Sequence, residues 1–151
     1  GPVGALPARL ITSMRIDFYV LQSPSPEARL HFAIRLTEKA WQQNCSVVLL
    51  VPDTATAELL DSELWQFKPE SFIPHSQVDG DAPVVITANP DLLPLRDLLI
   101  NLGPTLPGEV ERFQRLAEVV IQTPDVLEPT RQRYSRYKDM GYSVNTHKLA
   151  P

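Results

Sequence analysis

The side chains of this sequence best suited to binding chemistry are gathered near its C-terminal end. From position 131 onward the chain carries five cations and one acid, a net of +4, whereas the whole chain has a formal net charge of -4. The cations are Arg131, Arg133, Arg136, Lys138 and Lys148, and the acid is Asp139. The rest of the chain is therefore at -8, and this asymmetry predicts an anionic partner for the segment.

The spacing of these residues predicts a binding face on a helix. Arg131, Tyr134, Ser135 and Lys138 stand at i, i+3, i+4 and i+7, so on a helix they share one side. A guanidinium can hold a carboxylate through two hydrogen bonds while a neighbouring ring receives an apolar group. Spacing alone does not decide whether Tyr134 or Tyr137 packs inward.

Alternating strand-like and helix-like segments must position this face. We expect strands at residues 16–21, 47–51, 84–88, 98–102 and 118–122, and a last helix from about residue 130, with Pro129 in its first turn, to Gly141. This order predicts one α/β domain, residues 14–149, with a mainly parallel sheet of about five strands and helices on both faces. Residues 1–13, rich in proline and glycine, are left outside the domain as a foreign or disordered arm.

Three further helices are predicted between the strands. The first is capped by Ser25, begins at Pro26 and ends near Asn44, and the second is capped by Asp53 or Thr54. A short helix is expected at residues 109–115. Their expected inward residues are Leu30, Ala33, Ile34, Ala40 and Trp41 in the first helix, and Ala57, Leu60, Leu64 and Phe67 in the second.

A second candidate surface begins at the end of the second helix. Trp65 is rotated by about 100° from Leu64 and so lies toward the polar flank, where it is either a binding anchor or covered by a following loop. Pro69 and Pro74 favour an extended segment that displays Phe72. His75 follows, and we interpret it as structural or solvated instead of catalytic, because no second ligand stands at a metal-binding spacing from it.

Two blocks of sequence carry a family resemblance. RQRYSRYKDMGY, residues 131–142, and LWQFKPESFIPH, residues 64–75, resemble blocks typical of the chi subunit of bacterial DNA polymerase III, a clamp-loader accessory subunit. Together with DFYVL at 17–21 and DLLINL at 97–102, the likeness extends over nearly all of residues 14–149. In that family the matching tryptophan and phenylalanine receive the psi subunit, which implies a psi-binding surface of Trp65 and Phe72 with Pro74 and His75 beside them.

The resemblance also implies a use for the basic face. Chi subunits hold the acidic C-terminal tail of single-stranded DNA-binding protein, and Arg131 and Tyr134 match the family's positions. Family members often have a basic residue where this chain has Ser135, so the supporting cation is either lost here or moved to Arg133 or Lys138. The expected function is a non-catalytic replication adaptor that bridges psi and this tail. Two alternatives remain open: a repair adaptor that recruits a helicase, and a nucleotide-binding regulator.

Several classes of protein are disfavoured by missing motifs. The turn after the first strand, residues 22–26, has two prolines and no glycine, so it lacks the backbone N–H groups of a phosphate loop. We therefore expect a nucleotide-binding-like fold without a phosphate loop, with no catalytic residues, cofactor or metal. A sequence pI near 5.3 argues against direct binding to DNA. The lone Cys45 and the lack of long apolar runs predict a cytoplasmic protein with no membrane contact.

Overall fold

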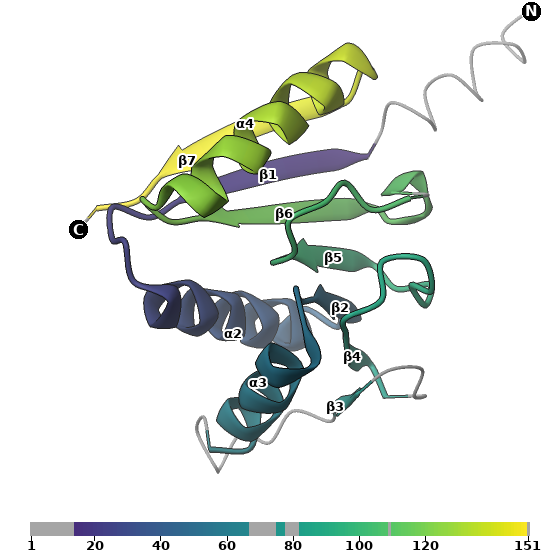
Figure 1. The fold of residues 1–151 in the computed structure, drawn as a ribbon. Coiled ribbons are helices and arrows are strands. Elements are labelled where there is room, and N and C mark those ends of the chain that lie inside the picture. Colours follow the sequence, from purple (N-terminus) through teal and green to yellow (C-terminus); the bar gives the residue numbers. More distant parts are fainter. Residues whose placement is uncertain (1–13, 67–74, 78–81, 109, 151) are drawn as a thin grey trace, which may run out of the picture.

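The computed structural model describes residues 14–66, 75–77, 82–108 and 110–150, which form a seven-stranded sheet with helices on both faces (Figure 1). The strand pairs are parallel, and the spatial order is β3-β4-β2-β5-β6-β1-β7. The predicted α/β fold is confirmed. The strands are β1 (Arg15–Val20), β2 (Val47–Leu50), β3 (His75–Gln77), β4 (Val84–Thr87), β5 (Leu98–Asn101), β6 (Arg115–Val120) and β7 (Ser143–Lys148).

The prediction of about five strands was too low, because the sheet has two more at its edges. Within the described part of the chain, β3 pairs with β4 alone and β7 pairs with β1 alone. An edge strand needs little apolar surface, so the polar sequence SVNTHK of β7 gives no strand signal. The C-terminal segment is thus part of the sheet and not a free tail.

Helices α2 (Pro26–Gln42) and α4 (Pro124–Asp139) cover opposite faces of the sheet. In β1, the Phe18 ring packs against Tyr134 and Tyr137 of α4, whereas the Tyr19 ring packs against Phe32 of α2. Successive side chains of a strand point to opposite faces, so the two helices lie on opposite sides. The residues of β2, β4 and β5 between these layers are all buried.

Helix α2 begins and ends largely as the sequence predicts. Ser25 caps it, accepting a hydrogen bond from the Ala28 amide at 3.2 Å, and Pro26 occupies the first turn. Asn44 has a φ of 61°, which carries the chain out of the helix. The buried residues Ala33, Ile34 and Ala40 lie on the predicted apolar face, and Leu30 and Trp41 are half-buried against the core.

Helix α3 (Thr54–Gln66) is capped by Asp53, whose carboxylate accepts a hydrogen bond from the Thr56 amide at 2.7 Å. Its predicted inward residues Ala57, Leu60 and Leu64 are buried, and Phe67 lies outside the described residues. The helix packs against β3 and β4.

The last helix begins earlier than predicted. Helix α4 starts at Pro124, and Pro129 lies inside it instead of in its first turn. Pro124 occupies the first turn, where its missing N–H costs no hydrogen bond, and Thr123 before it makes no side-chain capping bond. The end is as predicted: Gly141, with a φ of 87°, terminates the helix.

The segment before α4 also differs from the prediction. The short helix expected at residues 109–115 is a single 3-10 turn, Val110–Arg112, and β6 begins at Arg115 instead of residue 118. Among the described residues, no helix combines the length and apolar character needed to cross a membrane.

Candidate partner-binding surface on the last helix

The outer face of α4 presents the predicted group of binding residues to solvent. Arg131, Ser135 and Lys138 are exposed, and Tyr134 is half-buried. The Tyr134 and Phe18 rings pack in a T-shaped arrangement with centroids 5.3 Å apart, and Lys138 Nζ lies 5.6 Å from the centroid of the Tyr134 ring. Phe18 of the sheet therefore packs against this ring, and the Lys138 ammonium lies over it.

Arg131 is the freest cation of this face. Its guanidinium makes no ion pair or hydrogen bond with any other described residue. An exposed guanidinium without an internal partner keeps its donors available for a carboxylate from another molecule.

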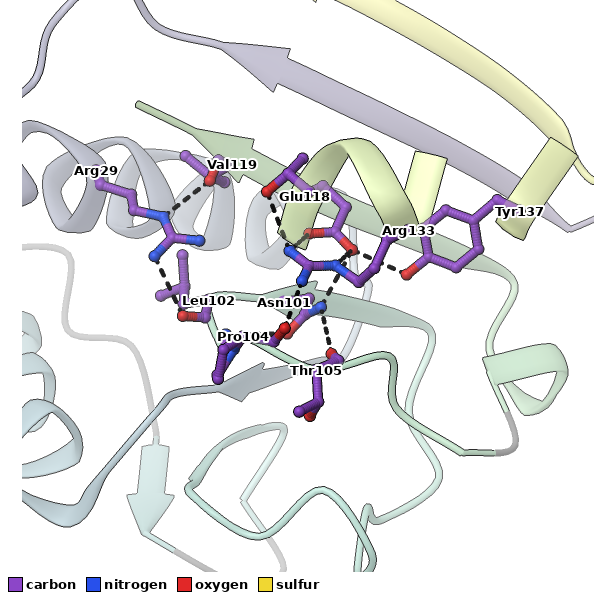
Figure 2. Close-up of polar contacts among 11 residues, drawn as sticks. Arg29, Asn101, Leu102, Pro104, Thr105, Glu118, Val119, Arg133 and Tyr137 are labelled. Carbon is purple, nitrogen blue, oxygen red and sulfur yellow. Dashed lines mark hydrogen bonds and ion pairs between the residues drawn. The ribbon is translucent and has the colours of Figure 1, made fainter. Parts of the chain in front are cut away.

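Arg133 lies elsewhere, and the expectation that it could supply a supporting cation is corrected. Only 4% of its surface is exposed, and it forms a two-point ion pair with the buried Glu118 of β6 (Figure 2). Arg133 Nε donates to Glu118 Oε2 and Nη2 donates to Oε1, each at 2.8 Å. Helical periodicity explains the placement, because Arg133 shares the inward stripe with Thr130 and Tyr137.

The Glu118 carboxylate is the centre of a larger buried network (Figure 2). Tyr137 Oη donates to Glu118 Oε2 at 2.8 Å, and Asn101 Nδ2 donates to the same oxygen at 3.1 Å. Arg133 Nη1 also donates to the Pro104 carbonyl at 2.9 Å. This network joins α4 to β5, to β6 and to the loop after β5, so it fixes both the position and the rotation of the helix.

The charges of this network reinforce one another. For Arg133, burial alone would lower the pKa, but the hydrogen bonds and charge of Glu118 outweigh it and raise the pKa. Burial raises the pKa of the Tyr137 hydroxyl, and the negative charge of Glu118 raises it further. Tyr137 therefore keeps the proton that it donates, and the helix stays fixed at neutral pH.

Sequence reasoning missed Glu118 as a positioning residue. Its signal was an acid inside the apolar run LAEVV, residues 116–120, because a buried carboxylate requires a cation close by. The inward tyrosine, which spacing left open, is Tyr137, with no exposed surface.

The cavity at the carboxyl ends of the strands, where open α/β sheets in general bind ligands, is small and lined by hydrogen-bonded side chains. At the C-terminal ends of the strands, beside Arg29, Gly103 and Arg133, lies a cavity of about 120 Å³. Typical small-molecule pockets have roughly 300–1,000 Å³. Arg29 donates to the carbonyls of Val119 at 2.8 Å and Leu102 at 3.2 Å, and burial lowers its pKa to about 10.

The loops at the ends of β1 and β6 are also joined. The Gln122 amide donates to the Ser23 carbonyl at 3.0 Å, and Gln122 Nε2 donates to the Leu21 carbonyl at 2.9 Å. The two strands continue into helices on opposite faces, so these bonds cross a topological switch point of the sheet. No cluster of three or more metal-ligating side chains is found among the described residues.

The second predicted surface is described only in part. Trp65 is in the last turn of α3, and His75 is the first residue of β3, which packs against α3. Phe72 and Pro74 lie outside the described residues. The backbone thus brings the segments that carry Trp65 and His75 together at one edge of the sheet.

Comparisons with known proteins agree on one family. Residues 14–145 match the family described as DNA polymerase III chi subunit, HolC. The DNA polymerase III subunit chi of Pseudomonas aeruginosa is 43% identical over 137 residues, covering 89% of this chain and 96% of that protein. The DNA polymerase III subunit chi of Haemophilus influenzae is 27% identical over 139 residues, covering 88% of this chain and 96% of that protein.

Similar solved structures show the fold alone. The C-terminal domain of the DEAD-box protein Dbp5 superposes with a TM-score of 0.61 at 12% identity, covering 90% of this chain and 92% of that one. T4 UvsW gives a TM-score of 0.59 at 10% identity, covering 92% of this chain and 42% of that one.

Proposed function

Since this chain belongs to the DNA polymerase III chi subunit family, we propose that it is a non-catalytic replication adaptor of the bacterial cytoplasm. It connects the clamp loader, through the psi subunit, to the acidic C-terminal tail of single-stranded DNA-binding protein. The observation that carries the proposal is the exposed face of Arg131, Tyr134, Ser135 and Lys138 on a helix held rigidly by Glu118.

The chemistry of this face suits a peptide that ends in an apolar residue and a free carboxylate. Arg131 offers an uncommitted guanidinium, and the Tyr134 ring, backed by Phe18, offers apolar surface one turn away. Lys138 supplies the second cation for the peptide, in place of the basic residue that family members often have at the position of Ser135. Arg131 and Lys138 are seven residues apart, or roughly 10 Å along the helix, so three or four extended peptide residues span both.

Rigidity favours a weak contact of this kind. A short peptide pays an entropic cost when it is ordered on a surface, and a preorganised surface adds no further cost of its own. Glu118, Arg133 and Tyr137 supply that preorganisation from inside the protein. We expect an affinity of about micromolar strength that weakens with added salt.

The helices that carry the two proposed surfaces pack toward opposite edges of the sheet. Helix α3 packs on β3 and β4 at one edge of the sheet, and α4 packs on β6 and β7 toward the other (Figure 1). Both partners can therefore bind at once. Attachment through psi then raises the effective concentration of the tail-binding face near DNA that is covered by single-stranded DNA-binding protein.

The test is a titration of a fluorescein-labelled tail peptide, from the single-stranded DNA-binding protein of the same organism, followed by anisotropy. Arg131→Ala is expected to weaken binding by roughly tenfold or more, because the charge-assisted contact to the carboxylate is lost. Arg136→Ala is the matched control, since Arg136 is an exposed cation of the same helix outside the proposed face.

A further variant tests the sequence departure at position 135. Ser135→Lys is expected to tighten binding several-fold by restoring a cation on the face. Equal affinities for wild type, Arg131→Ala and Arg136→Ala would contradict the proposed tail site.

A further inference from the structure

The face of the sheet opposite α4 carries a second basic surface. A groove of about 400 Å³ lies between α2 and the strands β1, β5 and β6. Four cations line it: Arg15, Arg35, Lys39 and Arg115. Arg35 and Lys39 are exposed, and the side chains of Arg15 and Arg115 are 51% and 41% exposed.

The acid beneath this groove is already neutralised. Asp17, only 1% exposed, accepts hydrogen bonds from Arg15 Nε at 3.1 Å and Arg115 Nη2 at 3.3 Å. His147 Nε2 lies 2.8 Å from Asp17 Oδ1. Four lining cations against this one acid leave a formal surplus of +3 among these arginine, lysine and aspartate side chains, in a chain whose formal total is -4. Such a local surplus in a concave surface attracts anions.

The groove also has an apolar floor. Leu36 and Ala40 of α2 face Leu98 and Ala117 of the sheet across it. The cations and this apolar strip together fit a ligand that presents carboxylates around an apolar side chain.

The aromatic rings at the groove argue against a nucleic acid as the ligand. The Tyr19 ring is stacked on His147, with centroids 5.0 Å apart, and is tilted against Phe32 at 5.2 Å. Arg35 lies 5.6 Å from the centroid of the Phe32 ring. Single-stranded nucleic acids are bound by stacking bases on free ring faces, whereas His147 stacks on Tyr19 and Arg35 lies over Phe32.

We propose that this groove is a binding site for an acidic peptide segment of a partner protein, separate from the α4 face. Carboxylates of the segment pair with Arg35 and Lys39 on one wall and with Arg15 and Arg115 on the other, and an apolar side chain rests over Leu36 and Leu98. The site does not depend on the proposed function of α4, because the two surfaces share no residue and lie on opposite faces of the sheet.

The experiment measures binding of a labelled peptide in which Asp and Glu residues flank a central leucine. The proteins are the full chain, the double variant Arg35→Glu with Lys39→Glu, and Arg131→Ala. Saturable binding that weakens with salt, falls by roughly tenfold in the double variant and persists in Arg131→Ala would support the groove. Arg136→Glu controls for charge reversal on an exposed helix surface.

Three outcomes would overturn the proposal. The first is no peptide binding, and the second is binding lost in Arg131→Ala but unchanged in the double variant, which would place the peptide on α4. The third is that a labelled oligothymidylate binds the groove and the peptide does not.

If the double variant fails to fold, the changes in amide chemical shift that the peptide causes in the wild-type chain take its place as the test. Shifts must then concentrate at Tyr19, Arg35, Lys39 and Arg115.

Discussion

Glu118 and Arg133 form a buried ion pair that holds the last helix in place. Both side chains are almost fully inaccessible, and their hydrogen bonds are made inside the protein. Burying such a pair costs desolvation energy, so it adds little net stability. Its main effect is on the position of α4, because any other position would leave a buried charge unpaired and raise the free energy. Removing one partner leaves the other charged and buried.

Arg133→Ala is therefore expected to lower the free energy of unfolding by about 3–5 kcal/mol. Urea unfolding followed by circular dichroism measures the change. Arg136→Ala, at an exposed position of the same helix, should change it by less than about 0.5 kcal/mol. The double variant Glu118→Leu with Arg133→Met should recover much of the lost free energy of unfolding. If Arg133→Ala does not destabilise the protein, the ion pair is dispensable.

Asp17 makes stability depend on pH in the acid range. Burial alone would raise its pKa, but hydrogen bonds from His147, Arg15 and Arg115 and the charge of Arg15 outweigh it, so the pKa lies below the ordinary value of 3.8. A carboxyl group with a depressed folded pKa contributes stability above its unfolded pKa and loses it as the pH falls through the folded pKa.

We expect the free energy of unfolding to fall between about pH 5 and pH 2, and to fall less in Asp17→Asn. Urea unfolding at several pH values measures how steeply the free energy of unfolding falls with pH in the wild type and in Asp17→Asn. Glu128→Gln, a carboxyl-to-amide change at an exposed position of α4, should keep the wild-type slope. Parallel curves for wild type and Asp17→Asn would exclude this role for Asp17.

Helices with clear caps and strands with strong apolar patterns were predictable from the sequence, whereas the strands at the two edges of the sheet were not. Helices α2 and α3 follow their caps, Ser25 and Asp53, and the buried strands follow their apolar runs. Strand β7 was missed because its place depends on pairing with β1, a contact far away in sequence. Arg133 was expected on the exposed face, although it stands at helical spacing from Thr130 and Tyr137, because its buried partner Glu118 of β6 was not recognised.

The end of α4 depends on the backbone of Gly141. Its φ of 87° is readily adopted by glycine and strained for other residues, and a Cβ added there would meet nothing within 4 Å. Gly141→Ala is thus expected to cost about 1–2 kcal/mol from backbone strain alone.

The expected fall in Tm is about 2–4 °C per kcal/mol for a chain of this size. Differential scanning calorimetry measures it. Gly108→Ala is the matched control, because Gly108 also has open space around the added Cβ and no positive φ. Equal Tm values for the two variants would contradict a special role for the backbone at Gly141.

At the scale of the molecule, the sheet separates the two proposed partner surfaces. The last turn of α3, with Trp65, is near β3, whereas Arg131 and Tyr134 are on the opposite face over β6 and β7. Sites that share no residue and lie this far apart are expected to act independently.

Saturating psi should therefore change the affinity for the tail peptide by no more than about twofold. Anisotropy titrations with and without psi measure this, and Trp65→Ala should abolish psi binding while leaving peptide binding intact. Competition between psi and the peptide would place both partners on one surface.

The position of β1 in the sheet has a consequence for synthesis on the ribosome. This strand, near the beginning of the chain, pairs only with β6 and β7, so that Ile16 stands opposite Leu116 on one side and Val144 on the other. Both hydrogen-bonding edges of an apolar strand stay open until the last third of the chain has emerged. Non-local pairing of this kind slows folding and exposes nascent chains to aggregation. We therefore expect stalled or prematurely ended chains of this protein to depend on chaperones.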